Sequence, residues 1–288
     1  MDPRLASLLR LLELERLEDN IFRGESRDIG SPQVYGGQVL GQALQAAYAT
    51  VDGGRVVHSL HAYFLRRGDF NAPIVYFVDR SREGHSFTSR RVTAIQHGEQ
   101  IFNCSASFQQ PEDGFEHQLA MPKVPFPEEL PETLAPGSEF LAGLSPRLRQ
   151  LMHERPIEFR AVPASAMAAP GGAPRQHLWI RTVDRLPDDD RLQRCLLAYA
   201  SDFRLLGTAL LRHEHSIAKG RLMIASIDHA MWFHRPARMD DWLLYAADSP
   251  SASGARGFTR GSLFKRDGVL VASTTQEGLV RVVSAEES

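Results

Sequence analysis

Apolar residues recur along the chain with two spacings, one typical of helices and one typical of strands. Leucines three to four positions apart predict a short helix over residues 4–17, and apolar residues at the same spacing predict a second helix over residues 36–48. Gly53-Gly54 follows the second helix and indicates where it ends. Shorter apolar runs between turn residues predict strands. In the first half of the chain these strands cover residues 21–29, 58–65, 74–79, 85–96 and 100–109.

The second half of the chain repeats this order of elements. A helix is predicted over residues 190–211, and the aspartates at its start suit the positive end of the helix dipole. The strands predicted after it cover residues 222–233, 242–247, 257–265 and 269–276. One long helix followed by antiparallel strands predicts, in each half, a curved sheet wrapped around a helix.

Short matches between the two halves support a duplicated unit. Their offsets along the chain stay within a few residues of one another, which predicts two similar units fused in one chain. The matched pairs are Leu40–Leu44 with Leu206–Leu210, His61-Ala62 with His229-Ala230, and Phe87-Thr88 with Phe258-Thr259. We therefore expect an α+β fold with two such units, and pairing between edge strands of their sheets.

The expected boundaries are residues 1–112 for the first unit, 113–175 for a linker and 176–288 for the second unit. The linker contains ten of the 17 prolines but also several large apolar residues, so it is expected to pack over the surface. Where the first unit has Gly36-Gly37-Gln38, the second has Asp202-Phe203-Arg204. This difference predicts that the second unit kept the chemistry while the first became a scaffold.

Composition excludes several classes of protein. The chain is 43% hydrophobic and 24% charged, as expected of a soluble globular protein, and its net charge of −2 gives no indication of a nucleic-acid or membrane partner. No apolar run approaches the ~18 residues that a membrane-spanning helix needs. Cys104 and Cys195 lie in different units without metal-ligand spacing, which favours reduced thiols in a cytoplasmic protein.

Several longer motifs, in the same order along the chain, resemble those of the acyl-CoA thioesterase II family. The similarity extends from about residue 20 to 282 and weakens in the linker. Its motifs are residues 36–44, 58–66, 86–92, 201–202, 227–236 and 275–281. The resemblance implies a double hotdog fold, dimers or tetramers, and hydrolysis of acyl-CoA without a metal or an organic cofactor. It also implies that Asp202, Ser226 and Gln276 jointly hold a water molecule.

The chemistry of the reaction suits these three residue types. A thioester carbonyl is electrophilic and a thiolate leaves readily, so an activated water suffices as nucleophile. A partly buried carboxylate can accept the proton of that water, while a hydroxyl and an amide fix its orientation. Asp202 lies among Tyr199, Phe203 and Leu206 and so borders an apolar face. Some family members have threonine in place of Ser226. Serine lacks the methyl group that restrains χ1 of threonine.

Other polar clusters point to rival sites. Asp228-His229 could form part of a Ser-His-Asp triad, but neighbouring residues of a strand face opposite sides. Ser86 follows Gly84-His85 as in a nucleophile elbow, yet it lies between two predicted strands rather than between a strand and a helix. His213-Glu214-His215 lacks the spacing of a helical zinc site.

Glycines and arginines complete the set of candidate features. The glycines at 36, 37 and 41 are attributed to close packing of the helix against the sheet. Guanidinium groups suit the phosphates of CoA. The candidates for that contact are Arg66, Arg67, Arg90, Arg91, Arg235 and Arg260.

Two further functional classes remain open from the sequence. A hotdog enoyl-CoA hydratase or dehydratase would use an Asp/His pair on the same thioesters. A non-catalytic protein would bind acyl-CoA without turnover.

Overall fold

A computed structural model describes residues 1–288 with the exception of 32, 134–145, 168–171, 214–220 and 284–288. Its α-helices are α1 (Pro3–Leu12), α2 (Gly36–Tyr48), α4 (Pro146–His153) and α5 (Asp190–Ser201), and its 3₁₀ helices are η1 (Pro127–Glu129), η2 (Ala164–Met167) and η3 (Leu206–Leu210). Glu214 and His215, which belong to the motif considered as a zinc site, lie outside the described residues.

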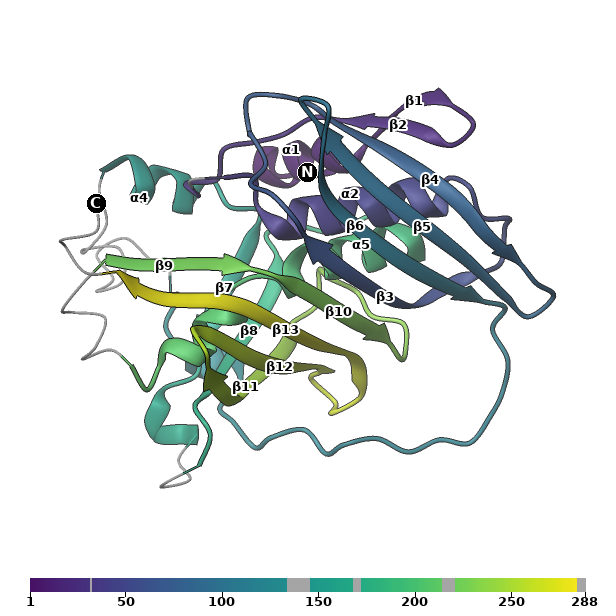
Figure 1. Ribbon diagram of the computed structural model, residues 1–288. Helices are drawn as coiled ribbons and strands as arrows, with labels where there is room; N and C mark the ends of the chain where they lie inside the picture. The colour runs from purple at the N-terminus through teal and green to yellow at the C-terminus, as the bar shows by residue number, and fades with distance from the viewer. Residues whose placement is uncertain (32, 134–145, 168–171, 214–220, 284–288) are drawn as a thin grey trace.

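The strands of the two units join into one antiparallel sheet (Figure 1). The strands of the first unit are β1 (Glu15–Glu18), β2 (Ile21–Gly24), β3 (Val56–Phe64), β4 (Ile74–Glu83), β5 (Phe87–Gln96) and β6 (Glu99–Gln109). Those that follow are β7 (Ile157–Ala161), β8 (Arg175–Thr182), β9 (Arg221–Ser226), β10 (Asp228–Phe233), β11 (Leu243–Ser253), β12 (Arg256–Lys265) and β13 (Leu270–Val283). The main order is β1-β2-β4-β5-β6-β3-β10-β13-β12-β11-β8-β7, and β9 pairs with β13.

The seam between the units is the pair β3–β10. Asp228 lies opposite Tyr63 and Trp232 opposite Ser59 in this antiparallel pair. The expected pairing of edge strands between the two sheets is therefore confirmed. A single apolar core crosses the seam and includes Leu40 of the first unit and Leu196 of the second.

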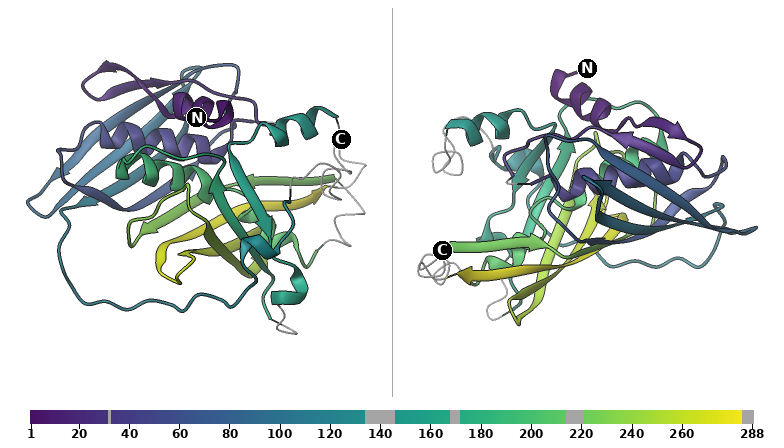
Figure 2. Two further views of the ribbon diagram at one scale, coloured as in Figure 1. Left: turned by 180° about the vertical axis from the view of Figure 1, so that it is seen from behind. Right: turned by 45° about the horizontal axis from the view of Figure 1, so that its top comes forward.

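Helices α2 and α5 lie side by side on one face of the curved sheet (Figure 2). They run in opposite directions, since Gly37 faces Tyr199 and Gly41 faces Cys195. Glycines of α2 allow the close approach: a Cβ atom on Gly37 would stand 2.1 Å from the carbonyl oxygen of Tyr199, and one on Gly41 3.2 Å from that of Cys195. These glycines therefore permit helix–helix packing. Our attribution of them to packing against the sheet was wrong.

The helix predicted to reach residue 211 ends ten residues earlier. Asp202 caps α5 with φ −81° and ψ −11°, and Arg204 then adopts a positive φ of 58°, which breaks the helical path. The matching segments Leu40–Leu44 and Leu206–Leu210 thus lie in different structures, the first inside α2 and the second in η3. That sequence match does not mark equivalent positions.

Of the other two sequence matches between the units, one marks equivalent positions in the structure and one does not. Thr88 and Thr259, near the starts of β5 and β12, both face the interior and are 1% and 0% exposed. His61, by contrast, is exposed on β3, whereas the matched His229 is fully buried on β10. A register irregularity in β3 between Val57 and Ser59 accompanies this difference, since a shift of one residue exchanges the two faces of a strand.

Three strands, β1, β7 and β8, were not predicted. The N-terminal helix ends at Leu12 rather than near residue 17, and Glu15–Glu18 pairs with β2 instead. β7 lies inside the segment expected to be a linker and pairs with β8. The part of that segment just after β6 runs along the outside of the second unit, where Gln118 bonds the main chain of Gly268 and Leu270 (Figure 1). Among the described residues, no helix is long and apolar enough to span a membrane.

Candidate active site

Asp202 stands where the C-terminus of α5 meets the N-terminus of α2. It is the C-cap residue of α5 and is partly buried. Its Oδ1 accepts a hydrogen bond from Nε2 of Gln276 at 2.7 Å, and its Oδ2 accepts one from the main-chain N–H of Gly37 at 3.0 Å. The carboxylate is thus oriented from both sides, by a strand and by a helix end.

Gln276 brings the three predicted residues together. It lies on β13 with no exposed surface, and its Nε2 also donates to Oγ of Ser226 at 2.8 Å. Its two amide hydrogens are thereby used on Asp202 and Ser226. Its buried Oε1 has no partner among the described residues, so it remains an acceptor inside the site. Asp202, Ser226 and Gln276, predicted from separate parts of the sequence, form one cluster.

The first unit contributes to this cluster. The N–H of Gly37 is one of the N-terminal groups of α2 that lack a partner within the helix. A Cβ on Gly36 would stand 2.8 Å from Oδ2 of Asp202, so this position tolerates little beyond glycine. That the second unit kept the chemistry stays a prediction, but the first unit directly supports the carboxylate, because the antiparallel helices place Gly36-Gly37 against Asp202. Sequence reasoning missed Gly37 since its contribution is a main-chain N–H; the Gly-Gly pair at the helix start was the available signal.

Burial raises the pKa of Asp202 above the usual range of an aspartate. Hydrogen bonds from Gln276, from the N–H of Gly37 and from Ser226 favour the carboxylate and offset part of that rise. The group is therefore a stronger base than a solvated aspartate while it stays hydrogen-bonded in its anionic form.

A cavity of about 210 Å³ opens beside the cluster at the seam between the units. Gly36 and Ser226 form part of its wall, together with apolar side chains such as Val39 and Phe102. Arg66 and Arg67 also line it. An apolar cavity that touches the polar cluster and carries basic groups has the character of a site for an anionic ligand with an apolar arm.

The six candidate arginines separate according to their surroundings. Arg90 is 1% exposed and is bonded to Thr50 and Glu83, so it serves the interior. Arg235 bonds Leu270, and Arg260 bonds Asp248 on the neighbouring strand. Only Arg66 and Arg67 of this set line the cavity beside Ser226.

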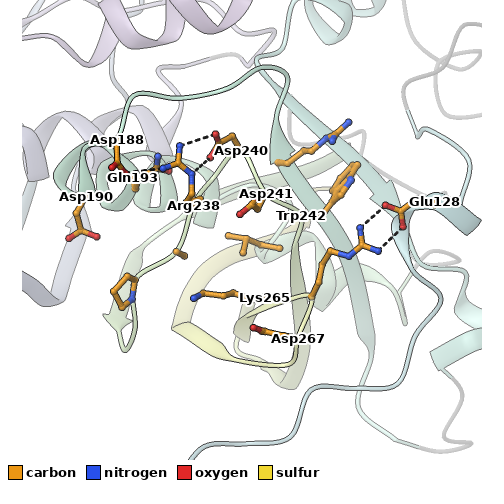
Figure 3. Close-up of a pocket in the computed structure, with 15 residues that line it drawn as sticks. Glu128, Asp188, Asp190, Gln193, Arg238, Asp240, Asp241, Trp242, Lys265 and Asp267 are labelled. Carbon is orange, nitrogen blue, oxygen red and sulfur yellow. Dashed lines mark hydrogen bonds and ion pairs between the residues drawn. The ribbon is translucent and has the colours of Figure 1, made fainter. Parts of the chain in front are cut away.

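A cavity of about 710 Å³ lies at the opposite end of α5 (Figure 3). Its wall includes Asp190 at the start of α5 but none of the three clustered residues. Many of its charges are already paired, as in Arg238 with Asp240 and Arg266 with Glu128. The structure gives this cavity no role in the chemistry at Asp202.

The rival triad is not assembled. Oδ1 of Asp228 accepts from the N–H of Glu277, whereas Nε2 of His229 lies 2.9 Å from Oγ of Ser201. Gly84 lies in the connection between β4 and β5, where its N–H donates to the carbonyl of Phe87. Ser86 therefore stands between two strands, and the nucleophile-elbow context is absent there.

Comparison with known proteins defines the class. The family profile described as "Acyl-CoA thioesterase" matches residues 151–279, and the one described as "Acyl-CoA thioesterase N-terminal domain" matches residues 23–109. The chain is 43% identical over 286 residues to "Acyl-CoA thioesterase 2" of Haemophilus influenzae, covering 98% of this chain and 99% of that protein.

Solved structures agree with this result. The acyl-CoA thioesterase II TesB2 of Mycobacterium marinum is 44% identical, with a TM-score of 0.83 and coverage of 98% of this chain and 100% of that one. A protein of unknown function with a hotdog fold from Alicyclobacillus acidocaldarius, 20% identical with a TM-score of 0.74, covers 96% of this chain and 98% of its own.

The fold and these comparisons thus define a thioester hydrolase of the double hotdog type. The predicted fold is confirmed. The chain belongs to the acyl-CoA thioesterase family.

Proposed function

We propose that the protein hydrolyses fatty acyl-CoA to a free fatty acid and CoA, with a water molecule activated by Asp202 and oriented by Ser226 and Gln276. The observation that carries this proposal is the double hydrogen bond of Gln276 Nε2, which unites a carboxylate and a hydroxyl at distances of 2.7 and 2.8 Å. The relatives that are 43% and 44% identical are both named acyl-CoA thioesterases, which supports the same substrate class.

In the proposed reaction the water gives one proton to Asp202 as its oxygen attacks the thioester carbonyl. The hydroxyl of Ser226 turns its single hydrogen from Asp202 to one lone pair of that water, which leaves the second lone pair for the attack. The C–S bond then breaks, CoA leaves as a thiolate, and the proton held by Asp202 returns to the thiolate or to solvent. Acyl-CoA and water thus give a fatty acid and the thiol of CoA, which accounts for all atoms, and no redox step is involved.

The oxyanion that develops on the carbonyl needs donors that are already in place. At the start of α2 the N–H of Gly37 donates to Asp202, and those of Gln38 and Val39 donate to the carbonyl of Tyr35. The N–H of Gly36 has no partner among the described residues, and Gly36 lines the cavity that Ser226 also lines. We place the thioester carbonyl there, because the positive end of the α2 dipole stabilises negative charge. The first unit then supplies the electrostatic part of the site and the second unit supplies the base.

A pH profile offers one prediction. Asp202 acts as a base only when ionised, and burial raises its pKa. The value of kcat/KM is therefore at its maximum above that pKa and falls as the pH decreases through it, with the midpoint above the usual range of an aspartate. Stopped assays across the acid range measure this fall, the acid limb of the profile. An acid limb that persists unchanged in the residual activity of Asp202→Asn contradicts the assignment of Asp202 as the base.

Arg67 provides a second prediction. Its exposed guanidinium at the cavity beside Ser226 suits a CoA phosphate, so Arg67→Gln is expected to raise KM for acyl-CoA by about 2- to 10-fold with little change in kcat. Lys265→Gln, which removes one positive charge from the cavity at the far end of α5, is the matched control. Equal KM values for the two variants contradict this role.

The overall test is thiol release from a ladder of short to long acyl-CoAs. Turnover supports the hydrolase, and the ladder reveals the preferred chain length. Addition of water to an enoyl-CoA without thiol release supports the hydratase alternative. Binding without turnover supports the non-catalytic alternative.

We further propose that the units extend over residues 1–112 and 176–288, with β7 of the intervening segment added to the sheet of the second unit, and that the protein is a cytoplasmic homo-oligomer. Sedimentation of the purified chain measures its oligomeric state.

A further inference from the structure

A buried chain of hydrogen bonds lies directly behind Asp202. It centres on the preceding residue, Ser201, which has no exposed surface. Nε2 of His229 on β10 lies 2.9 Å from Oγ of Ser201. The hydroxyl of Tyr245 on β11 donates to the carbonyl oxygen of Ser201 at 2.6 Å and lies 2.9 Å from Oγ1 of Thr274 on β13. The last residue of α5 is therefore attached to three strands through its side chain and its main chain.

The hydrogen-bond partners define the state of the imidazole. Oγ of Ser201 donates its single hydrogen to the carbonyl of Ala198 at 2.9 Å, so Nε2 of His229 is the donor in the bond between them. Nδ1 then carries no hydrogen, and it has no partner among the described residues although it is buried. Burial also lowers the pKa of His229 to about 3, which keeps the ring neutral at neutral pH.

An unpaired buried acceptor is a cost to stability, so stability alone does not account for a histidine here. At the seam, the inward-facing residues of β3 that lie opposite His229 and Met231 are Ala62 and Leu60, both apolar and almost fully buried. On this apolar face, the polar ring of His229 lies against Ser201, the last residue of the helix that precedes Asp202. The neighbouring acceptor Oε1 of Gln276, on the adjacent strand, is also buried without a partner in the described part of the chain.

We propose that His229 is a positioning residue for the reaction: with Tyr245 it fixes Ser201 and thereby holds the carboxylate of Asp202 against the N–H of Gly37 and the amide of Gln276. His229 touches neither the substrate nor the attacking water. Its effect is transmitted along one peptide unit, from Ser201 to Asp202. This inference rests on the proposed function.

The test compares His229→Leu with His229→Gln in the thiol-release assay. Leucine removes the donor, whereas the amide nitrogen of glutamine can approach the place of Nε2. We expect His229→Leu to lower kcat about 10- to 100-fold with KM within about 2-fold of wild type, and His229→Gln to recover most of that loss. In the leucine variant the acid limb of kcat/KM should move to higher pH, because Asp202 loses hydrogen bonds that favour its anion.

A merely structural role predicts a different result. Both variants would then melt at lower temperature, while the folded enzyme kept the wild-type kcat and the wild-type acid limb, and this outcome overturns the proposal. If His229→Leu does not fold, Tyr245→Phe takes its place in the test, since it removes the hydrogen bond to the Ser201 carbonyl with little change of shape. An unaltered kcat and an unaltered acid limb of the pH profile in this variant overturn the proposal as well. Failure of the proposed function is distinct, because the wild type would then release no thiol or Asp202→Asn would retain full activity.

Discussion

Replacing Asp202 with asparagine is expected to lower kcat for acyl-CoA hydrolysis by about 10²- to 10⁴-fold, the range that a well-placed general base contributes. Asparagine has nearly the same shape and retains one acceptor oxygen, so the contact with Gly37 or Gln276 can persist. It cannot take a proton from water at neutral pH. The loss should therefore appear in kcat, with KM and thermal stability close to those of the wild type. Thiol release under saturating acyl-CoA, together with a melting curve, measures both quantities.

Asp228→Asn is the matched control for this experiment. Asp228 is also partly buried near the site, but its Oδ1 accepts from the N–H of Glu277, an interaction that the amide oxygen of asparagine can reproduce. Its kcat is expected to stay within about 3-fold of wild type. The reverse pattern, with activity lost in Asp228→Asn and kept in Asp202→Asn, would exclude Asp202 as the base and assign that role to Asp228.

Most strands were predictable because their sequence pattern is local. The segment predicted over residues 85–96 is β5, which begins two residues later, and that predicted over 100–109 is β6, which begins one residue earlier. β8 was missed because Arg175–Thr182 follows a proline-rich stretch whose composition suggested a linker, and its assignment to the sheet depends on pairing with β11, a long-range contact. Composition cannot reveal such a partner.

The end of α5 shows why a repeat in sequence is an incomplete guide to equivalence in space. Leu206–Leu210 matches a stretch inside α2, yet Asp202 and the positive φ of Arg204 end the helix before it. Helical apolar spacing continues through this break, so periodicity alone extends the helix too far. The position of the break matters for the site, since α5 ends at the residue before Asp202, whose Oδ2 accepts from the N–H of Gly37.

The site was predictable to a similar, partial extent. Asp202, Ser226 and Gln276 were assigned from motifs, and the fold brings them within hydrogen-bond distance of one another. The contribution of the first unit to the site was not predictable, because Gly37 acts through its main-chain N–H and through the small space it occupies. Contacts of that kind depend on the antiparallel approach of two helices that lie far apart in sequence.

Gly37→Ala directly tests the close contact between α2 and α5 and is expected to affect both stability and activity. The added methyl would stand 2.1 Å from the carbonyl oxygen of Tyr199 and 2.5 Å from the ring of Tyr35, and a main-chain atom cannot rotate away as a flexible side chain can. The helices must separate or shift, which is expected to reduce the free energy of unfolding by about 1–3 kcal/mol. The N–H of Gly37 then moves away from Oδ2 of Asp202, so kcat should fall by about 10- to 100-fold.

Gly53→Ala separates this effect from the general consequence of replacing a glycine. A Cβ there meets no atom within 4 Å, so its free energy of unfolding should remain within about 0.5 kcal/mol of wild type and its kcat should be unchanged. Urea denaturation and thiol release on the same preparations provide the comparison. Wild-type stability and activity in Gly37→Ala would mean that α2 and α5 need not approach so closely for the site to work. A loss of stability without a loss of kcat would assign Gly37 to packing alone, and the part of the first unit in catalysis would then have to lie in the N–H of Gly36.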